Sequence, residues 1–506
     1  MKNRAAVSLT AILATGALAA CTSEGSNAPA TLTATPQQCA DFDTAVLDAQ
    51  DASTRWVEAA EGAPAYCEIT ATLTPAEGST IGVVYRLPAE WNGKLLGLGG
   101  GGWAGNVTIQ AATDGLSKGY ATLQTDGGNP GTDVWANSWV AERPASAEDF
   151  SHRAIHEMTV AGKAVAAAFY GQPHRRAYFQ GCSTGGRMAL MEAQRYPTDY
   201  DAIIAGAPVY TLQVQTSAVF RNQTFAAGGG AAGFSEGDLQ LVQAAVLAQC
   251  DAADGLADGI VNDPASCNWQ PRALQCTGTK TDQCLTAPQV TALQTAYDGI
   301  RASDGSWAMH PMRRGGEASW GFFVGTAGTG ADPTGGGGLG NLFPLFFGPG
   351  NAVTLANFND ANYLTVRTSP FAEMYEAKNP DLSAFFANGG RLLLWHGEND
   401  AGPSPVLSLD YARAVMAANP AAADQFRYVT LPGVGHCRGG PGADLVDYIS
   451  AMDDWVESGR APDRLIGTKE DGSLTRAHCA WPNVARYSGS GDANDPASWQ
   501  CMARSS

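Results

Sequence analysis

Apolar and polar positions alternate along the chain in a pattern that changes twice. From about Cys39 to Pro208, short β-rich runs alternate with stretches that have helical spacing. This alternation predicts a parallel sheet covered by helices on both faces. We predict strands at 81–87, 94–98, 120–123 and 176–180, and helices at 155–170 and 186–196.

The middle of the chain has a different composition. Residues 210–378 hold one clear helical pattern, at 238–249, together with two cysteine-bounded loops and glycine- and aromatic-rich stretches. Such a segment suits a lid over a pocket. The strand–helix rhythm then resumes with strands at 391–395 and 426–431 and a helix at 444–456. The pattern predicts a main domain formed by 39–209 and 379–506, with 210–378 inserted as a lid.

Composition narrows the class of protein. The 506 residues are 44% hydrophobic and 16% charged, as in a soluble globular protein. The net charge of -18 argues against a nucleic-acid partner, because phosphates would be repelled. A monomer that binds a small molecule is the expectation.

The N-terminus has the features of an export signal. A short basic region precedes an apolar stretch that ends at Ala20, so 1–20 is predicted to be a signal peptide. Leu18-Ala19-Ala20-Cys21 resembles a bacterial lipobox, which predicts acylation of Cys21 and a flexible tether over 21–38. The alternative is a plain signal peptide. We expect an exported protein, either a lipoprotein anchored in the outer membrane or a periplasmic or extracellular protein.

Ser183 lies in Gly181-Cys182-Ser183-Thr184-Gly185, which fits the G-x-S-x-G motif. This motif is a strand-to-helix turn that exposes a serine nucleophile at the edge of an α/β-hydrolase sheet. The motif alone is weak, and a structural serine in a glycine-rich turn is the alternative. Here it follows a predicted strand and opens a predicted helix, so we predict an α/β-hydrolase fold with Ser183 as the nucleophile.

His436 is the candidate base. It follows a predicted strand, and its neighbour Cys437 matches Cys182 beside the serine. If these two cysteines are bonded, His436 lies within reach of Ser183, as a general base must. The rival is His396 at a strand end, while His152 and His156 are interpreted as structural.

An acid must orient this histidine. Asp400 follows the predicted strand 391–395 and gives the chain order Ser, Asp, His of α/β-hydrolases, with Glu398 as the alternative. One oxyanion donor should be the backbone N–H of Thr184, and the second should come from the glycine loop 99–105. Glycines 97, 99 and 102 also match G-x-G-x-x-G, but 103–110 does not open as the helix that a dinucleotide site needs.

Eleven cysteines include Cys21 and ten others, an even number in an oxidising compartment. Close spacing suggests four pairs and leaves Cys182 and Cys437 for each other, although sequence does not fix the connectivity. A zinc site is disfavoured, because no C-x2-C pair occurs.

An acidic loop follows Cys250. Asp251, Asp254 and Asp258 are spaced i, i+3 and i+7 among glycines and can wrap a hard cation such as calcium. The alternative is a solvated acidic loop. We expect a structural Ca2+ and no organic cofactor.

These segments together resemble the tannase and feruloyl esterase family, which includes the mono(2-hydroxyethyl) terephthalate hydrolases. The likeness extends from Cys39 to Cys501. It implies a carboxylic ester hydrolase with Ser183, Asp400 and His436 as triad, and with Gly102 and Thr184 as oxyanion donors. It implies calcium ligation by Asp251, Asp254 and Asp258 and by the carbonyls of Leu256 and Ile260. The implied disulfides are Cys39–Cys67, Cys182–Cys437, Cys250–Cys267, Cys276–Cys284 and Cys479–Cys501.

Two departures concern the substrate. The family often has His-Gly-Trp-x-Asp-Pro around the acid, whereas this chain has Glu398 and Asn399 after Gly397 and Ala401 after Asp400. The terephthalate branch is expected to place an aromatic at Pro403 and to hold the substrate carboxylate with a lid arginine, yet 315–366 contains no Arg or Lys. Arg313, Arg314 or Arg367 are the possible substitutes.

We therefore expect neutral feruloyl- or gallate-type esters of aromatic acids, with the terephthalate monoester as alternative. Lid aromatics, Phe322 and Phe323 among them, are the predicted substrate-binding residues, with Trp320, Phe343, Phe346 and Phe347 as further aromatic surface. A lesser alternative is a non-catalytic, lipid-anchored binding protein. A nucleotide-dependent oxidoreductase is the other enzyme class considered.

Overall fold

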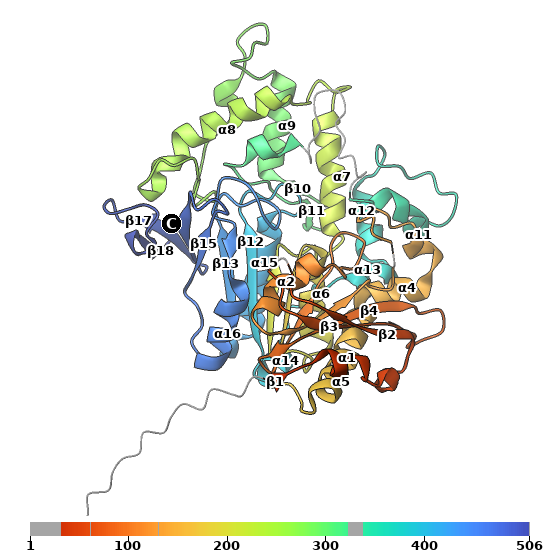
Figure 1. Ribbon diagram of the computed structural model, residues 1–506. Coiled ribbons are helices and arrows are strands. Elements are labelled where there is room, and N and C mark those ends of the chain that lie inside the picture. Colours follow the sequence, from red (N-terminus) through yellow and green to blue (C-terminus); the bar gives the residue numbers. More distant parts are fainter. Residues whose placement is uncertain (1–31, 61, 130, 322–336, 505–506) are drawn as a thin grey trace, which may run out of the picture.

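The computed structural model describes residues 32–60, 62–129, 131–321 and 337–504. Its centre is a sheet of nine strands within these residues (Figure 1). In order across the sheet, the strands are β2 (Ala49–Val57), β3 (Tyr66–Leu73), β4 (Ile81–Pro88), β7 (Ala121–Thr125), β6 (Lys94–Leu98), β8 (Arg176–Cys182), β9 (Ala202–Gly206), β12 (Arg391–Gly397) and β13 (Phe426–Leu431).

The sheet is mixed, so the prediction of a parallel sheet is wrong for the three strands β2, β3 and β4. Strands β7, β6, β8, β9, β12 and β13 are parallel, whereas β2, β3, β4 and β7 pair antiparallel. A short link joins β3 to β4, and antiparallel strands tolerate such links, whereas a parallel pair needs a long crossover. The parallel half has those crossovers, and there the strand–helix rhythm is clear.

Successive residues of the central strands point to opposite faces of the sheet. Leu95, Phe179 and Ile203 belong to the core under α5 (Ala154–Tyr170), α6 (Thr184–Arg195) and α15 (Pro405–Ala418). Their neighbours Leu96 and Tyr178 belong to the core under α2 (Ile109–Ser117) and α16 (Tyr448–Ser458). Helices therefore cover both faces of the sheet, which is an α/β-hydrolase arrangement. Short helices α1 (Pro36–Ala40), α3 (Trp139–Glu142), α4 (Pro144–Glu148) and α14 (Ser383–Ala387) complete this part.

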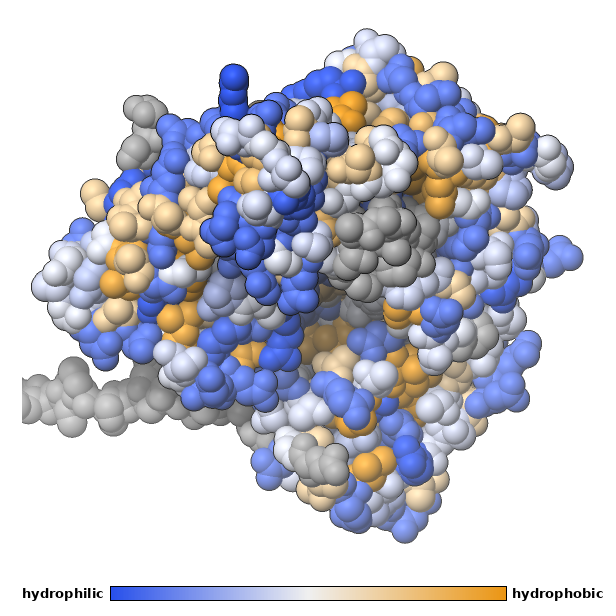
Figure 2. Space-filling model, turned by 90° about the horizontal axis from the view of Figure 1, so that it is seen from above, coloured by the Kyte–Doolittle hydropathy of each residue, from blue (hydrophilic) through white to orange (hydrophobic). Residues whose placement is uncertain are grey.

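Most of the chain between β9 and β12 forms the lid, whose helices α7 (Gln213–Ala226), α8 (Glu236–Cys250) and α9 (Ala287–Asp298) lie at the top of Figure 1. It is far more helical than its composition predicts, and it has a core of its own around Phe225, Leu239, Leu293 and Trp320. Seen from above, this side of the molecule shows hydrophilic residues with scattered apolar patches (Figure 2). Further lid helices are α11 (Phe343–Phe347), α12 (Asp360–Arg367) and α13 (Pro370–Tyr375), with the short strands β10 (Ile300–Arg301) and β11 (Trp307–Met309).

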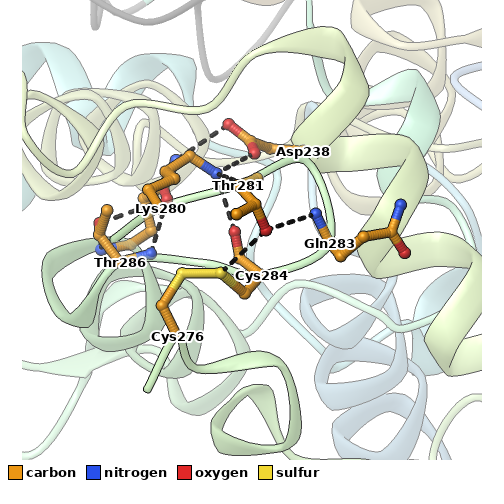
Figure 3. Close-up of a disulfide and its surroundings, with 8 residues drawn as sticks. Asp238, Cys276, Lys280, Thr281, Gln283, Cys284 and Thr286 are labelled. Atoms are coloured by element: carbon orange, nitrogen blue, oxygen red, sulfur yellow. Dashed lines mark hydrogen bonds and ion pairs between the residues drawn. A yellow bond between two sulfur atoms is a disulfide. The ribbon is translucent and has the colours of Figure 1, made fainter. Parts of the chain in front are cut away.

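Five disulfides join the pairs expected above, namely Cys39–Cys67, Cys182–Cys437, Cys250–Cys267, Cys276–Cys284 and Cys479–Cys501. The Cys276–Cys284 loop is also held to the start of α8 (Figure 3). Lys280 Nζ donates to Asp238 Oδ1 at 2.6 Å and to the carbonyl of Cys284 at 2.9 Å. The disulfide loop is thus fixed to the first turn of α8.

The C-terminal residues form two small sheets beside the lid. One comprises β14 (Leu445–Val446), β15 (Arg464–Thr468) and β16 (Thr475–Cys479), and the other is the hairpin of β17 (Asn483–Tyr487) and β18 (Trp499–Ala503). Near the N-terminus, β1 (Leu32–Thr33) pairs with β5 (Glu90–Trp91). Within the described residues, no helix has the length and apolar character needed to cross a bilayer.

Candidate functional site

Four parallel strands bring the predicted site residues to one edge of the sheet. Ser183 follows β8 directly, Asp400 and His436 come shortly after β12 and β13, and the glycine loop follows β6. Neighbouring parallel strands end at the same edge, which is where ligands bind in open α/β sheets. The topology therefore brings Ser183 and His436 together, although 253 positions separate them in the sequence.

The backbone at Ser183 is strained. Its φ of 62° and ψ of -122° lie outside the regions that a serine ordinarily adopts. The turn is held because Ser183 N donates to the carbonyl of Gly206 at 2.9 Å and α6 begins at the next residue. Strain of this kind at a sharp strand-to-helix turn is the geometry of a nucleophile elbow.

The glycine loop lies directly against this turn. A Cβ added to Gly99 would approach the Cα of Gly185 to 2.5 Å, so backbone contacts backbone there. Gly102 has a φ of +57°, and a Cβ on it would lie 2.3 Å from the carbonyl oxygen of Val134. Thr184 Oγ1 donates to the carbonyl of Gly102 at 2.6 Å, which links the two predicted oxyanion donors. Helix α2 begins only at Ile109, so the loop does not open a dinucleotide-binding helix.

Ser183, His436 and Asp400 form a continuous hydrogen-bonded chain. His436 Nε2 lies 2.9 Å from Ser183 Oγ, and His436 Nδ1 lies 2.6 Å from Asp400 Oδ2. The Cys182–Cys437 disulfide joins the residues next to the serine and the histidine.

The electrostatics of the pair match this geometry. Burial opposes charge on Asp400, but the charge of His436 and hydrogen bonds from His396 and His436 outweigh it and lower the pKa of Asp400 to about 2. Burial likewise disfavours the imidazolium of His436, but the charge of Asp400 and its hydrogen bond raise the pKa of His436 above its ordinary value. Asp400 is therefore ionised, and His436 has a higher proton affinity than an ordinary histidine.

The alternative residues are engaged elsewhere. Glu398 forms an ion pair with Arg313 at 3.2 Å and another with Arg504 at 3.8 Å. His396 Nε2 lies 3.0 Å from Asp400 Oδ2, whereas the histidine in contact with Ser183 is His436. The helical histidines bond to other partners, His152 to Tyr196 and His156 to Asp199.

A cavity of about 400 Å³ opens over Ser183. Its walls are mostly apolar, and its aromatic members are Trp103, Trp135 and Tyr375. The other lining residues are Gly101, Gly102, Val134, Cys182, Ser183, Thr184, Val209, Val214, Gln215, Ala218, Arg221, Gly337, Gly402, Pro403, His436 and Cys437. The size and apolar character suit a small ligand with an aromatic ring.

Within the described residues, the four further lid aromatics Trp320, Phe343, Phe346 and Phe347 do not line this cavity, contrary to the prediction. Trp320 is buried in the lid core with an edge-on contact to Tyr297, and Phe343 stacks on Phe358. Phe346 and Phe347 pack against the main core as well. Phe322 and Phe323 lie outside the described residues.

The arginines proposed as substitutes are also placed elsewhere. Arg313 pairs with Glu398, Arg314 donates to the carbonyl of Trp269, and Arg367 pairs with Asp304. Among the residues that the structure describes, the arginine lining the cavity is Arg221 on α7. Sequence reasoning missed it, because a single arginine in a polar helix carries no motif.

The acidic loop is held by its own backbone. Asp251 accepts from the N–H groups of Asp258 and Gly259, Asp254 from Leu256, and Asp258 from Ile260. Asp258 also pairs with Arg476 at 2.6 Å. Within the described residues, no three His, Cys, Asp or Glu side chains converge as a metal centre. The donor chemistry of this loop, carboxylates with neighbouring carbonyls, is the type that calcium takes.

The fold and this constellation define the class, an α/β-hydrolase with a serine at a strained strand-to-helix turn. The family model described as tannase and feruloyl esterase matches residues 67–327 and 350–502. The chain belongs to this family and is a carboxylic ester hydrolase.

Relatives and solved structures agree with that placement. The chain is 34% identical to a mono(2-hydroxyethyl) terephthalate hydrolase of Piscinibacter sakaiensis, over 87% of this chain and 85% of the relative. It is 30% identical to a probable feruloyl esterase B-1 of Aspergillus oryzae, over 87% and 84%. The crystal structure of feruloyl esterase B from Aspergillus oryzae matches with a TM-score of 0.82 and 26% identity, covering 92% of this chain and all of that one.

Proposed function

We propose that Ser183, His436 and Asp400 hydrolyse esters of aromatic acids through an acyl-enzyme. His436 Nε2 takes the proton of Ser183 Oγ as that oxygen attacks the ester carbonyl carbon. The tetrahedral intermediate then expels the alcohol, which receives the proton from His436. Water, deprotonated by His436, attacks the acyl carbon, and the carboxylic acid leaves as Ser183 recovers its proton.

The N–H groups of Thr184 and Gly102 are proposed to stabilise the oxyanion. The contact of the glycine loop with the nucleophile turn supports this pairing, as does the bond from the Thr184 hydroxyl to Gly102. The observation that carries the whole proposal is the chain Asp400–His436–Ser183 at the edge of an apolar cavity.

The substrate is proposed to be a feruloyl- or gallate-type ester. The apolar walls suit an aromatic ring, and a neutral ester places no buried charge among them. The second candidate is a terephthalate monoester, which Arg221 favours because it brings a cation to the cavity wall. Arg221 already donates to the carbonyls of Ala401 and Gly402, which is why we rank the neutral esters first.

The test is a comparison of kcat/KM on methyl ferulate, methyl gallate and mono(2-hydroxyethyl) terephthalate, with Ser183→Ala as control. We expect Ser183→Ala to abolish turnover of all three esters while the melting temperature stays nearly unchanged. Turnover by Ser183→Ala would contradict the mechanism, and about a hundredfold preference for the terephthalate ester would reverse the substrate ranking.

We also propose that the chain is exported and acylated at Cys21, on the strength of the lipobox-like Leu18–Cys21 segment. The mass of the purified full-length protein checks this, since Cys21→Ala should lose the acyl chains. An unmodified N-terminus at Cys21 would contradict it.

A further inference from the structure

The carboxylate of Asp400 lies between two histidines. Oδ2 is 2.6 Å from His436 Nδ1 and 3.0 Å from His396 Nε2, whereas Oδ1 accepts from the N–H of Gly402 at 2.8 Å. The side chains of His396 and Asp400 are both fully buried. No step of the proposed reaction uses His396, yet it makes one of the three hydrogen bonds to the carboxylate.

The proton on His396 Nε2 is fixed by its surroundings. Nε2 also lies 3.1 Å from the carbonyl oxygen of Pro403, so it faces two acceptors. A nitrogen between a carboxylate and a carbonyl must carry hydrogen. Nδ1 lies 2.7 Å from Ser408 Oγ, a hydroxyl that can either donate to it or accept from it. His396 therefore donates to Asp400 in every protonation state that this geometry allows.

We propose that His396 is a positioning residue for Asp400, and that it holds Oδ2 in line with His436 Nδ1; the proposal rests on the proposed function. With Gly402 on Oδ1 and His396 on Oδ2, the carboxylate cannot rotate away from the base. The bond from His396 to Pro403 fixes the end of the same loop. Arg221 holds its middle, since it donates to the carbonyls of Ala401 and Gly402 at 2.7 and 3.3 Å.

This role predicts a change in kcat with little change in KM. Neither His396 nor Asp400 lines the cavity, so substrate binding should not depend on them directly. Loss of the outer hydrogen-bond partner of a metal-bound histidine reduces function about 10- to 100-fold, and a similar loss is expected for this partner of a triad aspartate. The reaction step should weaken because the imidazolium formed on His436 meets a misplaced carboxylate.

The experiment compares His396→Leu, which removes the donor, with His396→Gln, whose side-chain amide can still donate. On methyl ferulate we expect His396→Leu to lower kcat about 10- to 100-fold with KM within about threefold, and His396→Gln to recover most of the loss. The matched control is His478→Leu. His478 is an equally buried histidine on β16 that donates to the carbonyl of Ala443, and its replacement should lower stability and spare kcat.

Equal losses in His396→Leu and His396→Gln, or parent kcat in His396→Leu, would overturn the proposal. A loss of kcat in His478→Leu as large as that in His396→Leu would overturn it as well. If His396→Leu does not fold, His396→Gln and Ser408→Ala decide. The proposal then requires both to keep KM, and Ser408→Ala to lower kcat because the imidazole ring loses the hydrogen bond that holds its orientation toward Asp400. His436→Ala distinguishes failure of this inference from failure of the proposed function, since an active His436→Ala variant would refute the proposed triad itself.

Discussion

At the scale of the residue, the charge on Asp400 sets the behaviour of His436. The carboxylate is buried, stays ionised because three N–H groups donate to it, and raises the pKa of His436. A base with a raised pKa is stronger once neutral, but it is protonated over a wider acidic range. The pH dependence of the reaction should therefore report the interaction between these two side chains.

We expect kcat/KM for a neutral ester to fall as the pH decreases through an apparent pKa above the value of about 6.5 that is usual for histidine. The reason is that a protonated His436 cannot accept the proton of Ser183. In Asp400→Asn this acid limb should move to lower pH, with residual activity that is far below the parent. Glu398→Gln is the matched control and should keep both kcat and the limb. An acid limb centred below 6 in the parent would contradict this account.

The hydrogen-bonded arrangement of the proposed triad could be predicted from sequence, because each member follows a strand and carries a local signal. Ser183 has its motif, His436 has a neighbouring cysteine, and Asp400 has its place in the chain order. Arg221 and His396 could not be assigned in this way. Their roles depend on which carbonyls and carboxylates face them after folding, and these come from other elements.

At the scale of the element, α6 combines the nucleophile turn with a buried acid. Glu192 is fully buried, and its two carboxylate oxygens have no hydrogen-bond partner among the described residues. Burial and the nearby Asp199 raise the pKa of Glu192 well above its ordinary range. The folded protein therefore binds a proton here that the unfolded chain releases near pH 4.3.

The contribution of this proton to the stability of the folded state decreases as the pH rises. Because the pKa is raised on folding, the stabilisation from this proton is complete below the unfolded pKa and is lost as the pH rises through the folded value. Glu192→Gln, which is neutral at every pH, should be more stable than the parent, with a difference in melting temperature that grows from pH 5 to pH 8. The exposed Glu470→Gln is the control and should show no such trend. A constant difference would contradict the shift.

Elements of the main domain were predictable, whereas most of those of the lid were not; the exception is the helix predicted at 238–249, which is α8 (Glu236–Cys250). The strands at 94–98 and 426–431 agree in both bounds, because their residues are continuously apolar or alternate regularly. Helix α7 buries Gln215, Thr216 and Arg221, so its sequence shows no apolar stripe. Helix α9 did carry a signal, a capping box of Thr286 and Gln289 with a proline in the first turn, which sequence reasoning passed over.

At the scale of the whole molecule, cross-links tie the lid and the C-terminal sheets to the catalytic edge. Arg504 pairs with both Glu398 and Asp263, and Arg476 pairs with Asp258 of the acidic loop. The Cys182–Cys437 disulfide closes a loop of 255 residues across the main domain. In the chain-entropy model such a closure stabilises by about 5 kcal/mol. The acidic loop thus belongs to a framework that joins the lid to the C-terminal sheets, and its residues do not line the cavity.

We propose that this loop binds Ca2+ through Asp251, Asp254 and Asp258 and the carbonyls of Leu256 and Ile260, and that the ion is structural. Three aspartates lie within eight residues, and Asp258 pairs with Arg476, while Asp251 and Asp254 accept hydrogen bonds from backbone and side-chain amides. A bound cation would neutralise carboxylate charge in this loop. These residues do not line the cavity, so chelation should lower the melting temperature and leave kcat at low temperature largely unchanged.

The size of that effect follows from mass action, since a ligand at a hundredfold excess over its Kd stabilises by about 2.7 kcal/mol. The measurement is thermal unfolding with EGTA, then with added Ca2+ or Mg2+, on the parent and on Asp254→Asn. Ca2+ should restore the melting temperature of the parent but not of Asp254→Asn, because loss of one carboxylate removes both charge and a ligand. Mg2+ should not replace Ca2+, because Mg2+ demands near-ideal octahedral geometry and gives up its waters reluctantly. Elemental analysis that finds no calcium in protein purified without chelator would remove the site. The Arg476–Asp258 pair and the bond from Arg486 to the carbonyl of Ala253 would then be the contacts that hold this loop to the C-terminal sheets.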